Sequence, residues 1–323
     1  MNSLHHLCHM DRWRKTWCEY KLSGRGYYHL CSDGWKSGCL FNKDSQYAFG
    51  MSSMAICSLL FDVIIYAFEL MPNHFHVILS GTGADCCKLF FYMKKRISAR
   101  LKKDGYVSLP AEYGFKLIPI WNEQQLKNNL LYVARNPYEK HLSAPGGYPW
   151  GSGYLNYSPL SKLLKAEYAG NMSVRRINRL TGSRISLPGH WLINEDLGIL
   201  PVSFVETSKV YKLFPVVKDY CTQLVKDYEA FARIASDIGE EIIFDEAETR
   251  DMVRQVLQNQ FGGKQLRELE KDGKYRLIAL LHTKFGLDVH AIARGVYLPE
   301  TIVRQVLGSK DYGIRQFREA PQR

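Results

Sequence analysis

The sequence predicts an α+β fold: a ferredoxin-like antiparallel sheet with helices on one face, followed by an all-α C-terminal region. Three observations predict this fold. Runs of β-forming residues alternate with segments that are apolar at helical spacing, in the order β-α-β-β-α-β-α. Two of the strands are separated only by a short Pro-Asn turn, which is typical of an antiparallel hairpin. After about residue 241 the periodicity is helical throughout.

Each element of the first half is predicted from its local composition. Pro119 marks the last strand as an edge strand, because proline is tolerated there. Asn122 and Gln125 form a capping-box pattern at the start of the following helix, and Pro137 is expected to stop it. In order, the predicted elements are a strand over 26–32, a helix over 45–60, strands over 61–70 and 74–80, a helix over 85–103, a strand over 115–120 and a helix over 123–135.

The 323 residues are enough for two domains, and 46% of them are hydrophobic, as in chains that bury a core. A Gly- and Pro-rich stretch over 145–153 is typical of a domain boundary. We therefore expect a lead-in over 1–23, a first domain over 24–157 and a helical C-terminal domain over 241–323. The middle region, 158–240, mixes short helices with other segments, and the sequence assigns it no fold.

The positive charge of the chain is large and regional. The formal net charge is +11, from 43 Lys and Arg against 32 Asp and Glu, which favours polyanionic partners, with nucleic acid first. Basic residues crowd the segments 94–103 and 175–184, whereas 240–248 is acidic. A surface that follows phosphates needs such regional charge. Net charge alone would also fit a protein that is merely basic.

Neither a membrane span nor a secretion signal is expected. The sequence has no run of about 18 uncharged apolar residues. Its N-terminal segment lacks the continuous apolar region of a signal peptide. The eight cysteines show no C-x-x-C spacing, which is typical of a reduced, cytosolic chain. We expect a cytoplasmic protein with no membrane partner.

A pair of histidines is the first candidate for a functional site. In the predicted strand 74–80, His74 and His76 project from the same face with Phe75 between them. Two imidazoles on one rigid face can hold a divalent metal and leave its other coordination positions open. An H-x-H pair on a strand is weak evidence by itself, so its spacing leaves a purely structural role open.

The helix over 123–135 carries the second candidate. At about 100° per residue, its apolar residues form a core stripe, and Asn128, Tyr132 and Asn136 stack on a different face. A metal held by two imidazoles and one amide oxygen can polarise a phosphodiester, and a tyrosine hydroxyl can attack the phosphorus. Mixed nitrogen and oxygen ligands suit Mg²⁺ or Mn²⁺. A single tyrosine is more often a packed amphipathic residue, and this reading also stays open.

Four segments resemble signature segments of the single-tyrosine HUH transposases, and most closely those of the REP-associated tyrosine transposases (RAYT). The resemblance covers about residues 24–157, in chain order. The matching segments are Arg25-Gly26-Tyr27-Tyr28-His29 (the family's first strand), Met71-Pro72-Asn73-His74-Phe75-His76-Val77 (M-P-N-H-x-H), Tyr132-Val133-Ala134-Arg135-Asn136-Pro137 (Y-[IV]-x-x-N-P) and Tyr148-Pro149-Trp150-Gly151-Ser152 (Y-P-W-S-S).

The resemblance implies an HUH domain over 24–157 and a role for each candidate residue. His74 and His76 would bind the metal, Tyr132 would be the nucleophile, and Asn136 would complete the site. The implied substrate is single-stranded DNA, at hairpin or palindromic repeats, with a 5′-phosphotyrosine intermediate and a free 3′-hydroxyl. Two departures affect the expected DNA contacts. Many relatives carry histidine at the position of Ala134, and many carry W-Q-x-x-[FY] where this chain has residues 121–125, W-N-E-Q-Q.

Further residues are candidates for DNA contacts. Basic side chains of the helix over 85–103 can neutralise phosphates, although a solvated helix face is an equally good reading for any single lysine. Three aromatic side chains can stack on unpaired bases, and core packing is expected of at least one. The candidates are Lys94, Lys95, Arg96, Arg100, Lys102 and Lys103 on the basic helix, with Tyr27, Tyr28 and Trp121 as the aromatic group.

The C-terminal region resembles a helix-turn-helix. Helices are predicted over 275–284, 289–294 and 301–307, with Gly295 opening a turn that is slightly longer than usual. A plain three-helix bundle is the alternative. In a helix-turn-helix, Thr301, Arg304 and Gln305 would face duplex DNA.

Three functions follow from these patterns. The first is a metal-dependent endonuclease and strand transferase acting on single-stranded DNA. The second is a catalytically idle DNA-binding regulator with the same fold. The third is a metal-dependent hydrolase of small phosphoesters. The sequence leaves a monomer and a homodimer that exchanges the tyrosine helix equally open.

Overall fold

A computed structural model describes residues 24–34, 38–140, 142–144, 146–155, 157, 164–240 and 242–309. The chain divides into two compact units between Leu224 and Val225. The expected lead-in, 1–23, lies outside the described residues, as does 310–323. The predicted domain boundaries at 157/158 and 240/241 stay predictions.

The first unit is built on a four-stranded antiparallel sheet, which confirms the predicted α+β class. Its strand order is β2-β3-β1-β4, and every neighbouring pair is antiparallel. β4 lies at one edge, as Pro119 predicts. The strands are β1 (Arg25–Ser32), β2 (Val63–Leu70), β3 (Phe75–Thr82) and β4 (Phe115–Ile120).

The hairpin between β2 and β3 places His74 differently from the prediction. The Met71 N–H donates to the His74 carbonyl over 2.9 Å, so these two residues close a turn made by Pro72 and Asn73. β3 therefore begins at Phe75, and His74 is the last residue of the turn. Only His76 of the histidine pair lies within a strand.

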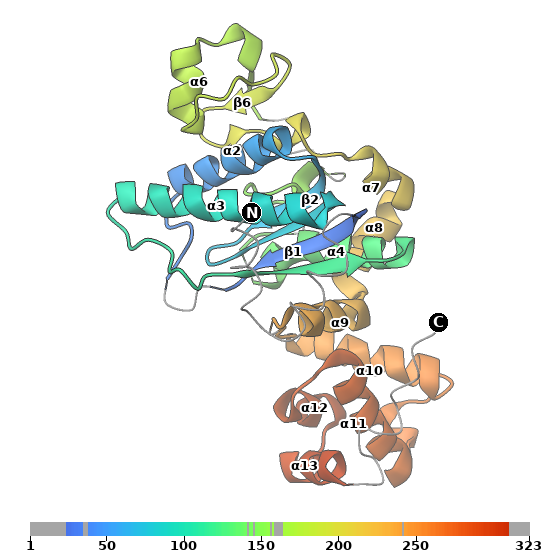
Figure 1. The fold of residues 1–323 in the computed structure, drawn as a ribbon. Helices are drawn as coiled ribbons and strands as arrows, with labels where there is room; N and C mark the ends of the chain where they lie inside the picture. Colours follow the sequence, from blue (N-terminus) through green and yellow to red (C-terminus); the bar gives the residue numbers. More distant parts are fainter. Residues whose placement is uncertain are drawn as a thin grey trace. The chain divides into compact units, whose positions relative to one another are not determined.

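Three helices cover the sheet, and they lie on both of its faces. α2 (Asp44–Leu60) and α3 (Gly83–Lys103) pack against each other on one face (Figure 1). Tyr28 and Leu30 of β1 point into this core. α4 (Glu123–Glu139) lies on the opposite face, where Asn129 is hydrogen-bonded to His29. The expectation of helices on one face is thus wrong for α4.

The local signals for α4 are partly confirmed. The Asn122 side chain accepts from the Gln125 N–H over 2.8 Å, as a cap should. The Gln125 side chain reaches the Trp121 N–H instead of that of Asn122. Pro137 lies inside the helix, which continues to Glu139, so the helix is four residues longer than the predicted range 123–135 and Pro137 does not stop it. Residues 130–137 are all buried, so α4 is covered on more than its apolar stripe.

The outer edge of β2 is covered by two later segments. The Ser152 N–H donates to the Phe68 carbonyl over 2.9 Å, and the Glu206 N–H donates to that of Ile65 over 2.8 Å. Gly151 faces Glu69 across this edge. A side chain at 151 would place its Cβ 2.6 Å from the Phe68 carbonyl oxygen, which explains why the residue here is glycine.

Residues 164–204, part of the region that the sequence left unassigned, form a small layer on α2. A three-stranded antiparallel sheet and α6 pack there around Trp191 and Ile193. The elements of this layer are β5 (Glu167–Tyr168), α6 (Val174–Thr181), β6 (Leu192–Asn194) and β7 (Gly198–Ile199), with short 3-10 helices at Ala169–Asn171 and Pro201–Ser203. Outside the layer are a 3-10 helix at Gly153–Leu155, α7 (Ser208–Leu213), which contacts α4, and α8 (Val217–Lys226).

The described part of the second unit is helical, with its own apolar core. α12 (Val289–Val296) and α13 (Glu300–Gly308) contact each other across a turn in which Tyr297 adopts a left-handed conformation. The remaining elements are α9 (Tyr228–Ile238), α10 (Glu246–Gln260), a 3-10 helix at Leu266–Glu268 and α11 (Lys271–Phe285). All three helices predicted here are present. None of the described helices is long and apolar enough to span a bilayer.

Candidate metal and tyrosine site

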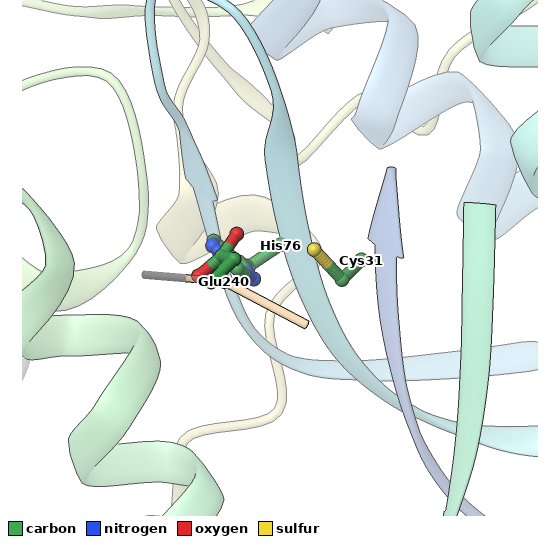
Figure 2. A group of neighbouring side chains, drawn as sticks. All are labelled: Cys31, His76 and Glu240. Atoms are coloured by element: carbon green, nitrogen blue, oxygen red, sulfur yellow. The ribbon is translucent and has the colours of Figure 1, made fainter. Parts of the chain in front are cut away.

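A polar row crosses the sheet on the face that α4 covers. The strand register places Glu69 of β2 opposite His76 of β3, and His76 opposite Cys31 of β1. Directly opposed residues of antiparallel strands point to the same face. Figure 2 shows His76 and Cys31 on their neighbouring strands. Glu240, which the figure also labels, belongs to the second unit and is not counted in this site.

The two predicted histidines meet at their outer ring nitrogens. The Nε2 atoms of His74 and His76 lie 3.0 Å apart, and the rings are nearly perpendicular, at 89°. The Asn73 side-chain oxygen lies 2.8 Å from Nδ1 of His74. That oxygen can only accept, so His74 carries its proton on Nδ1 and a lone pair on Nε2.

A third histidine, His29 of β1, is hydrogen-bonded to the pair. Its Nε2 lies 3.0 Å from Nδ1 of His76, and its Nδ1 lies 2.9 Å from the side-chain oxygen of Asn129. The Asn129 amide nitrogen donates to the Gln125 carbonyl over 2.8 Å, which fixes the orientation of the amide. The sequence predicted neither His29 nor Asn129 as a site residue, although alternation along β1 puts His29 opposite the core-facing Tyr28 and Leu30.

The pair of Nε2 atoms fits a divalent metal ion. If both atoms carry lone pairs, a separation of 3.0 Å needs a positive charge between them. Nε2 atoms at this separation are close enough for both imidazoles to bind one divalent ion. The donor set of neutral imidazoles also suits Mn²⁺. His74 and His76 are therefore the residues that would hold the ion.

Tyr132 and Asn136, one turn apart on α4, are both buried, and the Tyr132 ring lies beside His76. The Tyr132 ring meets His76 and His29 edge-on, at centroid distances of 5.8 and 6.0 Å. The face of α4 that carries these two residues was predicted to lie away from the core. The sheet packs on this helix face, so Tyr132 is only 2% exposed and Asn136 only 1% exposed. Among the described residues, neither polar atom of the Asn136 side chain has a hydrogen-bond partner. An unsatisfied buried amide needs a further ligand.

One solved structure is similar to this chain. It is the structure of a REP-associated tyrosine transposase bound to a REP hairpin, with 18% sequence identity and a TM-score of 0.37; the match covers 46% of this chain and 85% of that one. No family model and no curated protein matches the sequence.

Glu69 is a buried acid that the sequence did not single out. It is 1% exposed; its Oε1 accepts from the Gly153 N–H over 2.9 Å, and its Oε2 has no hydrogen-bond partner among the described residues. Burial raises the pKa of this carboxyl well above its usual range, and the Gly153 hydrogen bond only partly opposes the shift. In the sequence, the only signal was one charged residue within an apolar strand.

The raised pKa of Glu69 predicts a specific dependence of stability on pH. Between the unfolded and folded pKa values the folded state binds more protons, so the free energy of unfolding falls as pH rises, by up to about 1.4 kcal/mol per pH unit. Glu69→Gln cannot ionise, and its stability relative to the wild type should therefore grow from pH 4 to pH 8. Urea unfolding in EDTA measures this difference. Parallel pH profiles of the two proteins would contradict the assignment.

The basic helix α3 presents only some of its predicted DNA ligands. Lys95, Lys102 and Lys103 are exposed. The Lys94 ammonium donates to the carbonyls of Ala111 and Tyr113 over 2.7 and 2.6 Å, and it is only half-buried.

The two arginines of α3 are engaged within the protein. The Arg96 guanidinium donates to the Thr181 carbonyl over 2.7 Å and lies 4.5 Å from the centre of the Phe49 ring. Arg100 pairs with Asp104 over 2.9 Å. These contacts attach α6 to the core and close the end of α3, so the three lysines are the better candidates for phosphate contacts.

The three aromatic candidates also differ in how exposed they are. Tyr28 is 2% exposed and lies in the core, as expected of at least one of the three. Tyr27 is half-buried, with its ring centre 5.4 Å from that of Tyr66. Trp121 is 61% exposed, just before α4 begins.

The three candidates on α13 are exposed, as a DNA-facing surface requires. Thr301, Arg304 and Gln305 lie opposite the buried Val303 and Val306. Arg304 forms an ion pair with Glu300 of its own helix over 3.0 Å, which a DNA phosphate would have to displace.

Proposed function

We propose that this protein is a metal-dependent endonuclease and strand transferase that acts on single-stranded DNA, with Tyr132 as the nucleophile. The observation that carries the proposal is the 3.0 Å approach of the two Nε2 atoms of His74 and His76 beside the Tyr132 ring. Asn136 supports it as a buried amide whose polar atoms lack partners among the described residues.

The reaction needs the residues of this site, a divalent ion and a phosphodiester. The Tyr132 oxygen forms a bond to phosphorus while the bond from phosphorus to the 3′-oxygen breaks. The tyrosine proton is lost and the leaving 3′-oxygen gains one, so the products are a 5′-phosphotyrosine and a free 3′-hydroxyl. Reversal by another 3′-hydroxyl joins strands without a nucleotide cofactor. A divalent ion would supply Lewis-acid stabilisation of charge on the phosphate oxygens.

The DNA contacts of this proposal come from two surfaces. On the first unit, the exposed Lys95, Lys102 and Lys103 would contact phosphates, and Trp121 would stack on an unpaired base. On the second unit, α12 and α13 would act as a helix-turn-helix that binds duplex DNA with Thr301, Arg304 and Gln305.

A second function, a DNA-binding regulator without catalysis, is favoured by the burial of Tyr132. At 2% exposure the side chain cannot meet a phosphodiester unless residues that cover it move. A regulator would need only the basic surface and the helices of the second unit, and Tyr132 would remain a packing residue.

Adduct formation tests the two functions against each other. The full chain is incubated with hairpin oligonucleotides from the DNA flanking its own gene, labelled at the 3′ end, because the 5′-phosphotyrosine retains that fragment. With Mn²⁺ we expect a protein–DNA band that resists denaturant, and with EDTA none. Hairpin binding without any adduct, for every flanking hairpin, would contradict the enzyme and support the regulator.

A further inference from the structure

His29 lies between the metal candidates and the tyrosine helix. It is 0% exposed, and both of its ring nitrogens are within hydrogen-bond distance of a named partner. One partner is Nδ1 of His76, on the neighbouring strand, and the other is Asn129 of α4. The Tyr132 ring also meets the His29 ring, so one imidazole contacts both parts of the site.

Asn129, His29 and His76 form a row of hydrogen bonds. The donor and the acceptor of each bond can be assigned in turn, starting from Asn129. The Asn129 nitrogen donates to the Gln125 carbonyl, so its oxygen faces His29 and must accept the proton on His29 Nδ1. His29 Nε2 is then an acceptor, and it takes the proton on Nδ1 of His76. His76 is left with its lone pair on Nε2, the atom that faces His74.

We propose that His29 and Asn129 are positioning residues that fix His76 in the tautomer able to bind the metal. This inference rests on the proposed function, because it assigns His76 as a metal ligand. Outer-shell partners of this kind hold the tautomer and the ring orientation of a ligating histidine. Without His29, the Nδ1 proton of His76 loses its acceptor, and the alternative tautomer would put an N–H at the metal position.

The same row of hydrogen bonds links the candidate metal ligands to the helix that carries the candidate nucleophile. Asn129 and Tyr132 are three residues apart on α4, so they lie on one side of the helix. A displacement of α4 that moves Tyr132 also moves the acceptor that orders His29. Metal binding and the docking of α4 therefore stabilise each other.

Metal affinity tests the role of His29 without relying on catalysis. We expect His29→Phe to weaken Mn²⁺ binding by about 10- to 100-fold, the usual effect of losing an outer-shell partner. His29→Gln should restore much of the affinity, because its oxygen can accept from His76 and its nitrogen can donate to Asn129. His190→Phe, an exposed histidine of the same unit, is the matched control. Titration calorimetry of the full chain with MnCl₂ measures all four proteins.

Asn129→Leu is the second variant, because it leaves the buried imidazole in place. It should weaken Mn²⁺ binding in the same direction, and the nitrogen NMR shifts of His76 in the metal-free protein should lose the signature of a proton on Nδ1. Folded His29→Phe and Asn129→Leu proteins that bind Mn²⁺ as tightly as the wild type would overturn this inference alone. A wild type that binds no Mn²⁺ would overturn the metal-dependent function as well.

Discussion

Tyr132→Phe is expected to abolish the covalent DNA adduct and to lower cleavage by at least about 10³-fold, because it removes the only oxygen that can bond to phosphorus in the proposed reaction. Phenylalanine keeps the ring that meets His76 and His29, so Mn²⁺ affinity should change little. Denaturing gels of the 3′-labelled hairpin, with calorimetry for the metal, measure both quantities.

Tyr138→Phe is the matched control for this variant. Tyr138 lies on the same helix, half-buried, with its ring beside the Arg135 guanidinium. The adduct should form normally in this protein. Hydrolysis of a small phosphoester that survives Tyr132→Phe would point instead to the third function, a metal-dependent hydrolase.

His76→Ala is expected to weaken Mn²⁺ binding by more than about 100-fold and to abolish the adduct, since it removes one of the two imidazoles that would hold the ion. His74→Ala should act in the same direction. Hairpin binding should persist in both variants, because the exposed lysines of α3 are unchanged.

The position of His74 makes the comparison of the two variants informative. His74 ends a turn at 7% exposure, whereas His76 is fully buried within a strand. His76→Ala also leaves the Nε2 of His29 without its donor, so it should cost more stability than His74→Ala. Thermal unfolding in EDTA measures that difference. An adduct formed by either variant at wild-type rate would exclude the proposed metal site.

The sheet and its helices could be predicted because their signals are local. The turn pair Pro72-Asn73, the cap at Asn122 and the apolar stripe of α3 each act within a few residues of chain. The side of the sheet on which α4 packs could not be predicted in this way. It depends on both faces of β1 and β3 being buried, and alternation along one strand does not distinguish a second helix layer from solvent.

Only part of the candidate site could be predicted from the sequence. His74, His76, Tyr132 and Asn136 belong to short motifs, and in the structure His76 meets both His74 and the Tyr132 ring. His29, Asn129 and Glu69 were missed because their relation to His76 follows from strand register and from the packing of α4. Register is fixed by contacts between segments that are distant in sequence.

The two edges of the main sheet differ in a way that bears on self-association. β2 is closed by the backbone hydrogen bonds of Ser152 and Glu206, whereas β4 ends the sheet on the other side and contains Pro119, which offers no N–H. Extension of the sheet by a second copy is therefore blocked on one side and weakened on the other. Neither edge of the main sheet therefore favours the addition of a strand from a second copy, and the helices and side chains of the described residues are the better candidates for a dimer contact.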